Sequence, residues 1–149
     1  RRLSVRIRSQ APLYYDNGDM MLVYRIEGAS GKGPYTDPKC ERTLGRYSFG
    51  FNSKAHPGPY RDINNKKLRE LDGEKYFACN SIGQLMSWWH NDKVNLDFEK
   101  AGANIVVYSV PDKYVAIGNK QVAFIKKRSK KIDTIKISDV VSTLYYENM

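Results

Sequence analysis

The sequence predicts a single small α+β domain with a mixed or antiparallel sheet, one main amphipathic helix and long loops. The chain has 149 residues, which is the usual size of one domain. Segments with strand composition outnumber those with helical periodicity. A tight-turn sequence separates two of the predicted strands, as in an antiparallel hairpin. Together these three observations favour the α+β class.

The first core strand is expected at residues 20–27, MMLVYRIE, a compact apolar run rich in β-forming residues. It is followed by the glycine-rich stretch GASGKGP. Residues 28–72 are interrupted by glycine, proline and asparagine, so they are predicted to be long loops with brief strands or turns. Loops of this length in a small domain are more often functional than idle.

The clearest helix begins after a short strand at residues 76–78. Ser81 is the expected N-cap, and Gln84 follows at the spacing of a capping box, in which each side chain satisfies a free backbone N–H. The apolar residues that follow have helical spacing and define one face, made of Ile82, Leu85, Met86 and Trp89.

A second short helical segment is expected at residues 95–102, where Gly102 can take the left-handed conformation that ends a helix. The strand predicted at residues 103–111, ANIVVYSVP, is apolar almost throughout. Such a run is expected when both faces of a strand are covered.

The last third of the chain predicts two strands of a hairpin, a further strand and a helix. Residues 114–125 form the hairpin, with Gly118 and Asn119 supplying positive φ angles in a tight turn. Residues 131–137 form the next strand. The closing helix spans residues 138–149 and has Ser138 as its N-cap.

The net charge indicates an anionic partner but does not say which kind of anionic partner it is. The formal net charge is +9, which favours nucleic acid, an anionic membrane surface or an acidic protein. No apolar run reaches the roughly 18 residues of a membrane helix, and we expect no secretory signal. We therefore expect a cytoplasmic protein without a membrane partner. Cys40 and Cys79 are expected to be buried or free thiols.

The densest basic run is KKRSKK, which holds Lys126, Lys127, Arg128, Lys130 and Lys131. With Tyr145, Tyr146 and the tyrosine-rich loops, it could bind a phosphodiester backbone. The alternative is a solvated hairpin end. No zinc-finger, basic-zipper or RNA-recognition signature accompanies the run, so nucleic-acid binding would follow the backbone rather than read the sequence.

Two other motifs are weak. The loop GASGKGP offers Lys32 among glycines, but no Ser or Thr follows that lysine and no helix is expected after it, so a phosphate-binding P-loop is disfavoured. Cys40, His56, Cys79 and His90 are zinc-binding types without the short spacings that organise a zinc site. No metal ligand is therefore predicted.

Three segments taken together resemble the ordered signature of the ADP-ribosyltransferase fold. They are a first strand with Tyr24 and Arg25, a strand leading to Ser81 and its helix, and the later segment KQVAFIKKRSKKIDTIKI. The resemblance implies that Arg25 binds an NAD phosphate or ribose and that Ser81 orders the nicotinamide pocket. It places Gln121 where that family usually has its catalytic glutamate.

The glutamine changes what this resemblance implies. An amide can accept a hydrogen bond from a ribose hydroxyl, but it lacks the negative charge that stabilises a cationic transition state. Arg25, Ser81 and Gln121 are therefore candidates for a weak transferase, a glutamine-dependent variant or a binding-only descendant. NAD would be the ligand, or a host macromolecule the target. The alternative is a non-enzymatic basic protein that contacts nucleic acid or inhibits a host defence complex.

The peptides GKGPY, SIGQLMSWW and KQVAF resemble small uncharacterised proteins of phages and prophages. The codons of residues 4–8 would match the T arm of a tRNA gene, and the encoded CCA tail would fall on Pro12. We expect residues 1–19 to be read-through of such a gene and residues 20–149 to form the domain, starting at Met20 or Met21. An accessory gene of a bacterial prophage or genomic island is then expected.

Overall fold

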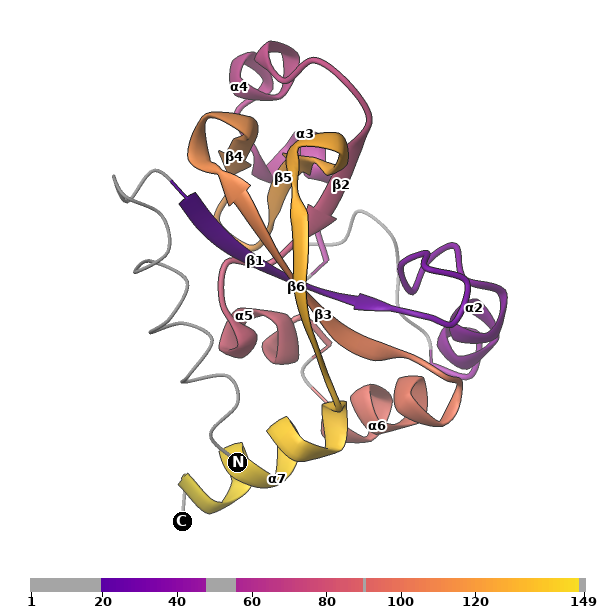
Figure 1. The fold of residues 1–149 in the computed structure, drawn as a ribbon. Helices are drawn as coiled ribbons and strands as arrows, with labels where there is room; N and C mark the ends of the chain where they lie inside the picture. Colours follow the sequence, from indigo (N-terminus) through magenta and orange to yellow (C-terminus); the bar gives the residue numbers. More distant parts are fainter. Residues whose placement is uncertain (1–19, 48–55, 90, 148–149) are drawn as a thin grey trace.

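Two three-stranded antiparallel sheets and several short helices make up the domain, as the ribbon in Figure 1 shows. The computed structural model describes residues 20–47, 56–89 and 91–147, with side chains described up to residue 142. Residues 1–19, His90 and the side chains of Tyr145 and Tyr146 lie outside this described part. The predicted single α+β domain is confirmed as a fold class.

The first sheet has the strand order β1-β3-β6, and the second has the order β2-β5-β4. β1 and β3 pair along eight residues, from Met20 opposite Pro111 to Glu27 opposite Asn104. This long central pair organises the first sheet. The strand bounds are β1 (Met20–Glu27), β2 (Lys75–Ala78), β3 (Asn104–Pro111), β4 (Val115–Ile117), β5 (Val122–Ile125) and β6 (Lys130–Ile135).

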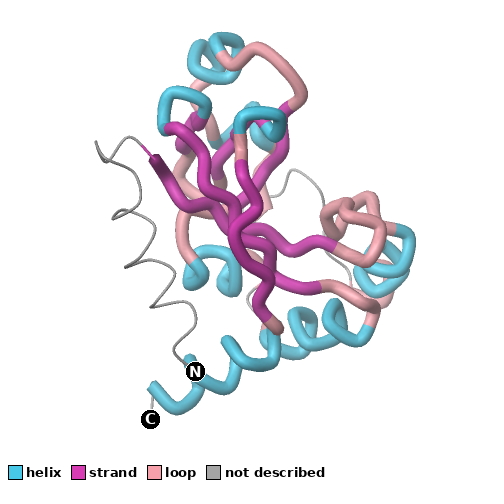
Figure 2. The backbone as a smooth tube through the Cα atoms, in the orientation of Figure 1, coloured by secondary structure: helices cyan, strands magenta, loops and turns pink. Residues whose placement is uncertain are grey.

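Helices cover both ends of the strand assembly, as the tube in Figure 2 shows. No helix within the described ranges is long and apolar enough to cross a membrane. The α-helices are α2 (Pro38–Leu44), α3 (Pro59–Asp62), α4 (Asn65–Glu70), α5 (Ile82–Ser87), α6 (Asp92–Lys100) and α7 (Ile137–Glu147); the 3₁₀ turns are η1 (Asp112–Tyr114) and η2 (Lys126–Arg128).

The prediction of loops across residues 28–72 is wrong where α2, α3 and α4 form. Local capping explains each start. The Asp37 side chain accepts a hydrogen bond from the backbone N–H of Cys40, and Asn64 accepts bonds from the N–H groups of the next turn. α3 begins at Pro59, whose fixed φ suits the first helical position.

The core has three layers of apolar contacts, because the central strands are covered on both faces. Tyr24 and Ile26 of β1 pack toward α2, α5, α6 and α7. Val23 points the other way, into the space between the two sheets, where it meets Phe124 of β5. Leu68 of α4 packs on the outer face of the second sheet. The expectation that the β3 run is buried on both faces is confirmed.

The capping box at α5 is confirmed, with one difference. Ser81 Oγ accepts from the Gln84 backbone N–H at 3.0 Å, while Gln84 Oε1 accepts from the N–H of Asn80 rather than of Ser81. The predicted apolar face is buried throughout. The expected end of the next helix is also confirmed, because Gly102 follows α6 with φ +95°.

Two predicted details are wrong: the conformation of one turn and the N-cap of one helix. Gly118 is not among the described glycines with positive φ, although β4 and β5 do form the predicted hairpin. The carboxylate of Asp62 holds this turn by accepting from the backbone N–H groups of residues 119–121. α7 begins at Ile137, so Ser138 is not its N-cap; Glu99 Oε1 accepts the Ser138 N–H at 2.8 Å.

Replacing Ser81 by alanine tests the capping box. The Ser81→Ala variant should lose about 1 kcal/mol of unfolding free energy in urea, because the Gln84 N–H loses its acceptor. Ser87→Ala is the control, since the exposed Ser87 hydroxyl only donates to a helix carbonyl. Equal unfolding free energies for the two variants would contradict the role of the cap.

Candidate functional site

The two sheets are joined by backbone hydrogen bonds at a single described residue pair. The N–H of Tyr24 in β1 donates to the carbonyl of Cys79, just after β2, and the N–H of Cys79 donates back, both at 2.8 Å. On the side of this bridge where Arg25 follows Tyr24 and Phe77 precedes Cys79, no further backbone hydrogen bond joins β1 to β2 in the described chain. The two strand edges therefore separate beside this bridge.

A cavity of about 550 Å³ lies beside this opening. Four segments line it: the end of β1, the loop at residues 32–36, the outer edge of β2 at residues 74–79, and the end of the α5 region with Trp88 and Trp89. Gln121 lines it from the turn before β5. The volume falls within the range of small-molecule sites, about 300–1,000 Å³.

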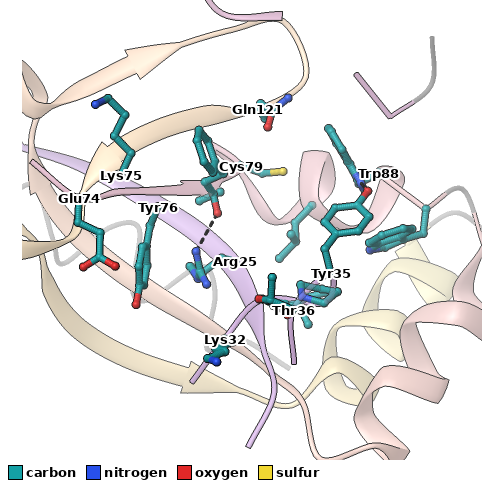
Figure 3. Close-up of a pocket in the computed structure, with 17 residues that line it drawn as sticks. Arg25, Lys32, Tyr35, Thr36, Glu74, Lys75, Tyr76, Cys79, Trp88 and Gln121 are labelled. Atoms are coloured by element: carbon teal, nitrogen blue, oxygen red, sulfur yellow. Dashed lines mark hydrogen bonds between the residues drawn. The ribbon is translucent and has the colours of Figure 1, made fainter. Parts of the chain in front are cut away.

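The cavity carries charge and aromatic rings in different places, as Figure 3 shows. Lys75, Glu74 and Tyr76 lie at one side of the view. Tyr35 and Trp88 lie at the other side, and Arg25 and Lys32 lie between the two groups. The lining includes three cations and one carboxylate, Glu74. Because Glu27 pairs with one of these cations, Arg25, the charged part keeps only a small net positive charge, from Lys32 and Lys75.

Arg25 is held in place from three sides. Its Nη1 donates to the carbonyl oxygen of Phe77 at 3.1 Å, its Nε lies 2.9 Å from Glu27 Oε2, and its guanidinium lies 4.3 Å from the centre of the Tyr76 ring. Only 8% of the residue is exposed. Arg25 therefore ties the separated edges of β1 and β2 together through its side chain.

Glu27 makes this buried cation tolerable. Glu27 Oε2 accepts a hydrogen bond from the Tyr108 hydroxyl at 2.6 Å. The same oxygen forms the ion pair with Arg25, so both charges have partners. Burial first, and then the bond to Glu27, raises the pKa of Tyr108 well above its usual value. Tyr108 therefore stays protonated and keeps donating to Glu27 at neutral pH.

The aromatic part is also preorganised. Trp88 Nε1 donates to the Tyr35 hydroxyl at 3.2 Å, and the Tyr35 ring lies 5.5 Å from that of Trp89. Burial raises the pKa of Tyr35, while the bond from Trp88 partly offsets the rise. The three rings come from segments more than fifty residues apart and form one apolar wall.

Asp37 fixes the loop that brings Lys32 and Tyr35 to the cavity. Its carboxylate accepts from the N–H of Ser30 at 3.2 Å, from the Ser30 hydroxyl and from the Cys40 N–H at 3.1 Å. Burial raises the pKa of Asp37, but the bonds from Ser30 and Cys40 outweigh it and lower the pKa to about 2. The loop thus depends on an ionised carboxylate.

The three residues that the ADP-ribosyltransferase resemblance singles out do not all meet in the cavity. Arg25 and Gln121 line it, whereas Ser81 is absent from the lining and caps α5. Gln121 Nε2 donates to the Pro57 carbonyl at 2.8 Å. The later segment, which the resemblance takes as one strand, forms the two strands β5 and β6 of different sheets, in keeping with the separate strands predicted at residues 114–125 and 131–137.

The two cysteines are unsuited to nucleophilic chemistry. Both are free and buried, and Cys79 also lines the cavity. Burial raises the pKa of each thiol to about 12, with a further contribution from Asp37 at Cys40 and from Asp62 at Cys79. Across the described residues, no group of three or more His, Cys, Asp or Glu is placed to hold a metal ion.

The predicted basic run forms an exposed strip over η2 and the start of β6, made of Lys126, Lys127, Arg128, Lys130 and Lys131. We call these five residues the basic strip. Two of its cations lie over aromatic rings: Lys126 Nζ is 5.2 Å from the centre of the Tyr76 ring, and the Arg128 guanidinium is 5.2 Å from that of Tyr114. Among described residues, no carboxylate forms an ion pair with the strip.

Sequence reasoning missed most of the cavity wall. Tyr35, Trp88, Lys32 and Lys75 line it, and none of them was a predicted site residue. One signal was available, because Trp88 falls outside the apolar face of its helix and still is a large aromatic residue. Lys32 lies in the glycine-rich loop, where the lack of a P-loop pattern disfavours a phosphate site.

The fold and the cavity define a small α+β protein with an aromatic and cationic pocket between two sheets. The family model described as Bacteriophage T4 Y00F protein matches residues 21–138, and the chain belongs to this family. A search of curated proteins and a search of solved structures each found no match. The comparisons thus support a phage protein family and give no support to an ADP-ribosyltransferase fold.

The low pKa of Asp37 predicts a pH-dependent contribution to stability. Because the pKa in the folded protein lies below the ordinary value of 3.8, ionised Asp37 stabilises the fold above about pH 4, and this contribution disappears as pH falls through 2. Asp37→Asn should therefore be less stable than the unmodified protein at pH 6, by about 1 kcal/mol, because a neutral amide oxygen accepts the bonds from Ser30 and Cys40 more weakly than a carboxylate does. The difference should shrink toward pH 2.

The measurement is urea denaturation at several pH values. Glu41→Gln, which removes an exposed carboxylate from the same helix, is the control and should show little effect at any pH. A deficit of Asp37→Asn that is the same at pH 6 and pH 2 would contradict the account of the loop.

The burial of both thiols predicts slow modification. Neither Cys40 nor Cys79 should react with a disulfide reagent such as DTNB in the folded protein at pH 8, because the thiolate is the reactive form and both pKa values are about 12. Two thiols should react at once in 6 M guanidinium, a standard unfolding condition. Fast reaction of either thiol in the folded state would contradict the burial.

Proposed function

We propose that this phage-family protein is an accessory protein that binds a nucleotide-like ligand in the cavity between its sheets. The observation that carries the proposal is the arrangement of the lining: cations at Arg25, Lys32 and Lys75, and an aromatic wall at Tyr35 and Trp88. A nucleotide has the matching order, with an anionic phosphate at one end and a flat base at the other.

Each part of such a ligand would gain by a known interaction. A base stacked on an aromatic side chain contributes about 1–3 kcal/mol. A phosphate gains charge-assisted hydrogen bonds from lysine and arginine, which are about twice as strong as neutral ones. Glu74 is the lining carboxylate that repels an anion, and Glu27 neutralises Arg25, so Lys32 and Lys75 are the cations left to attract a phosphate.

The proposal concerns binding and not group transfer. ADP-ribosyl transfer needs negative charge near the ribose as the bond to nicotinamide breaks. Gln121 offers a neutral amide, and its Nε2 donates a hydrogen bond to the Pro57 carbonyl oxygen. Ser81 is occupied as a cap. NAD is therefore included as a candidate ligand, without a reaction assigned to it.

A second candidate function is nucleic-acid binding by the basic strip. The observation that favours it is the absence of ion pairs between its five cations and any carboxylate within the described ranges. Cations without nearby acids attract phosphates most strongly, and such binding weakens steeply with salt.

Tryptophan fluorescence tests the first proposal directly, because Trp88 and Trp89 are the two tryptophans of the chain and both line the cavity. Titration with AMP, dTMP or NAD should give a saturable quench with at least one of them. The double variant Lys32→Gln/Lys75→Gln should bind that ligand about tenfold more weakly, through loss of charge-assisted bonds.

The matched control is Lys66→Gln/Lys67→Gln, which removes two exposed lysines from α4, a helix that does not line the cavity. It should bind as the unmodified protein does. No saturable change in fluorescence with any of the three nucleotides would contradict the proposal, as would equal weakening in both double variants.

A further inference from the structure

We propose that the cavity and the basic strip form one continuous site for a single-stranded nucleic acid, with one unpaired nucleotide in the cavity and the neighbouring backbone on the strip. This inference rests on the proposed nucleotide-binding function and names its ligand as a polymer. It starts from Tyr76, which lines the cavity and has a cation of the basic strip over its ring.

The ring of Tyr76 lines the cavity and carries two cations. The Arg25 guanidinium, also a lining residue, lies 4.3 Å from its centre, and Lys126 Nζ of the strip lies 5.2 Å from it. A backbone hydrogen bond also connects the basic strip to the cavity wall, because the Lys126 N–H donates to the carbonyl of Glu74, a lining residue, at 3.2 Å. The strip therefore begins at the wall of the cavity.

The strip meets the cavity at the end that suits a phosphate. Tyr76 and Lys75 lie on the charged side of the cavity, and the aromatic wall of Tyr35 and Trp88 lies on the other side (Figure 3). A strand that passes from the strip into the cavity would therefore bring its phosphates to the cations first and its base to the rings last. This is the order in which a nucleotide projects from its backbone.

The fixed positions of the strip cations favour phosphate contacts. Lys126 and Arg128 lie over the rings of Tyr76 and Tyr114, so part of the cost of ordering these side chains is already met in the free protein. Lys127, Lys130 and Lys131 add charge along η2 and β6. Asp112 is the last acid before the strip in the sequence and Asp133 the first after it, and neither forms an ion pair with the strip among the described residues.

The single strand is preferred over a duplex because the cavity needs an unpaired base. A base within a duplex is stacked and paired, and moving it into a pocket costs unpairing energy. Positively charged grooves combined with aromatic rings are the usual design of proteins that bind single strands. A duplex would reach the strip with its phosphates and leave the aromatic wall empty.

The test compares dTMP, the single-stranded octamer dT8 and a G·C-rich DNA hairpin, whose stem stays paired in low salt and serves as the duplex. Binding is followed by tryptophan fluorescence, which reports the cavity, and by anisotropy of a labelled oligonucleotide, which reports any contact. We expect dT8 to quench the tryptophans and to bind at least tenfold more tightly than dTMP in low salt, because the strip adds phosphate contacts. The duplex should bind more weakly and leave the fluorescence unchanged.

The variant Lys127→Gln/Arg128→Gln separates the strip from the cavity. It should bind dTMP normally and dT8 about tenfold more weakly, with a salt slope reduced by about 1.4, the value for two lost phosphate contacts on a single strand. The control Arg42→Gln/Lys100→Gln removes the same two residue types from α2 and α6, which lie apart from η2 in Figure 1, and should behave as the unmodified protein.

Different failures have different meanings. If dTMP quenches the tryptophans and dT8 binds no more tightly, or if both double variants bind dT8 alike, the continuous site is wrong and the nucleotide cavity remains. If dT8 binds only in the anisotropy assay, or the duplex binds as well as the single strand, the continuous site is again wrong. If none of the ligands changes the fluorescence, the proposed nucleotide-binding function fails with it.

Discussion

The structure depends on how two sheets are joined at one point. β1 is paired with β3 along its whole length, yet it reaches β2 through a single backbone bridge between Tyr24 and Cys79. Where the edges separate, the side chain of Arg25 bonds the Phe77 carbonyl that a neighbouring strand would otherwise bond. A buried cation can hold this position only because Glu27 neutralises it. The cavity is a consequence of this opening.

This origin explains why the cavity wall is chemically mixed. Strand edges supply backbone groups, the loop held by Asp37 supplies Lys32, and the end of the α5 region supplies Trp88. The loop also supplies Tyr35, which meets Trp88 of the α5 region at one side of the cavity, while Lys75 of β2 lies at the other side. The chain belongs to the Bacteriophage T4 Y00F protein family. The cavity is the feature of this fold on which the nucleotide-binding proposal rests.

Local signals predicted much of the fold and little of the site. The capping box of Ser81 and the two-sided burial of β3 follow from neighbouring residues, so the sequence pattern was sufficient. The turn at Gly118 was misjudged because Asp62, more than fifty residues away, holds it. Arg25 was identified as a candidate, but its partners come from the β1–β2 geometry. Lys75 lines the same cavity as Arg25 only through that long-range arrangement, which no local pattern contains.

The most direct test of the central claim is a ¹⁵N NMR titration with dTMP. The claim is that a nucleotide occupies the opening between the sheets. It predicts that the largest shifts fall on the indole N–H of Trp88 and on the backbone amides of residues 32–36, apart from Pro34, and of residues 74–79, which line the cavity. Shifts confined to the basic strip, or no saturable shift in these segments, would contradict it.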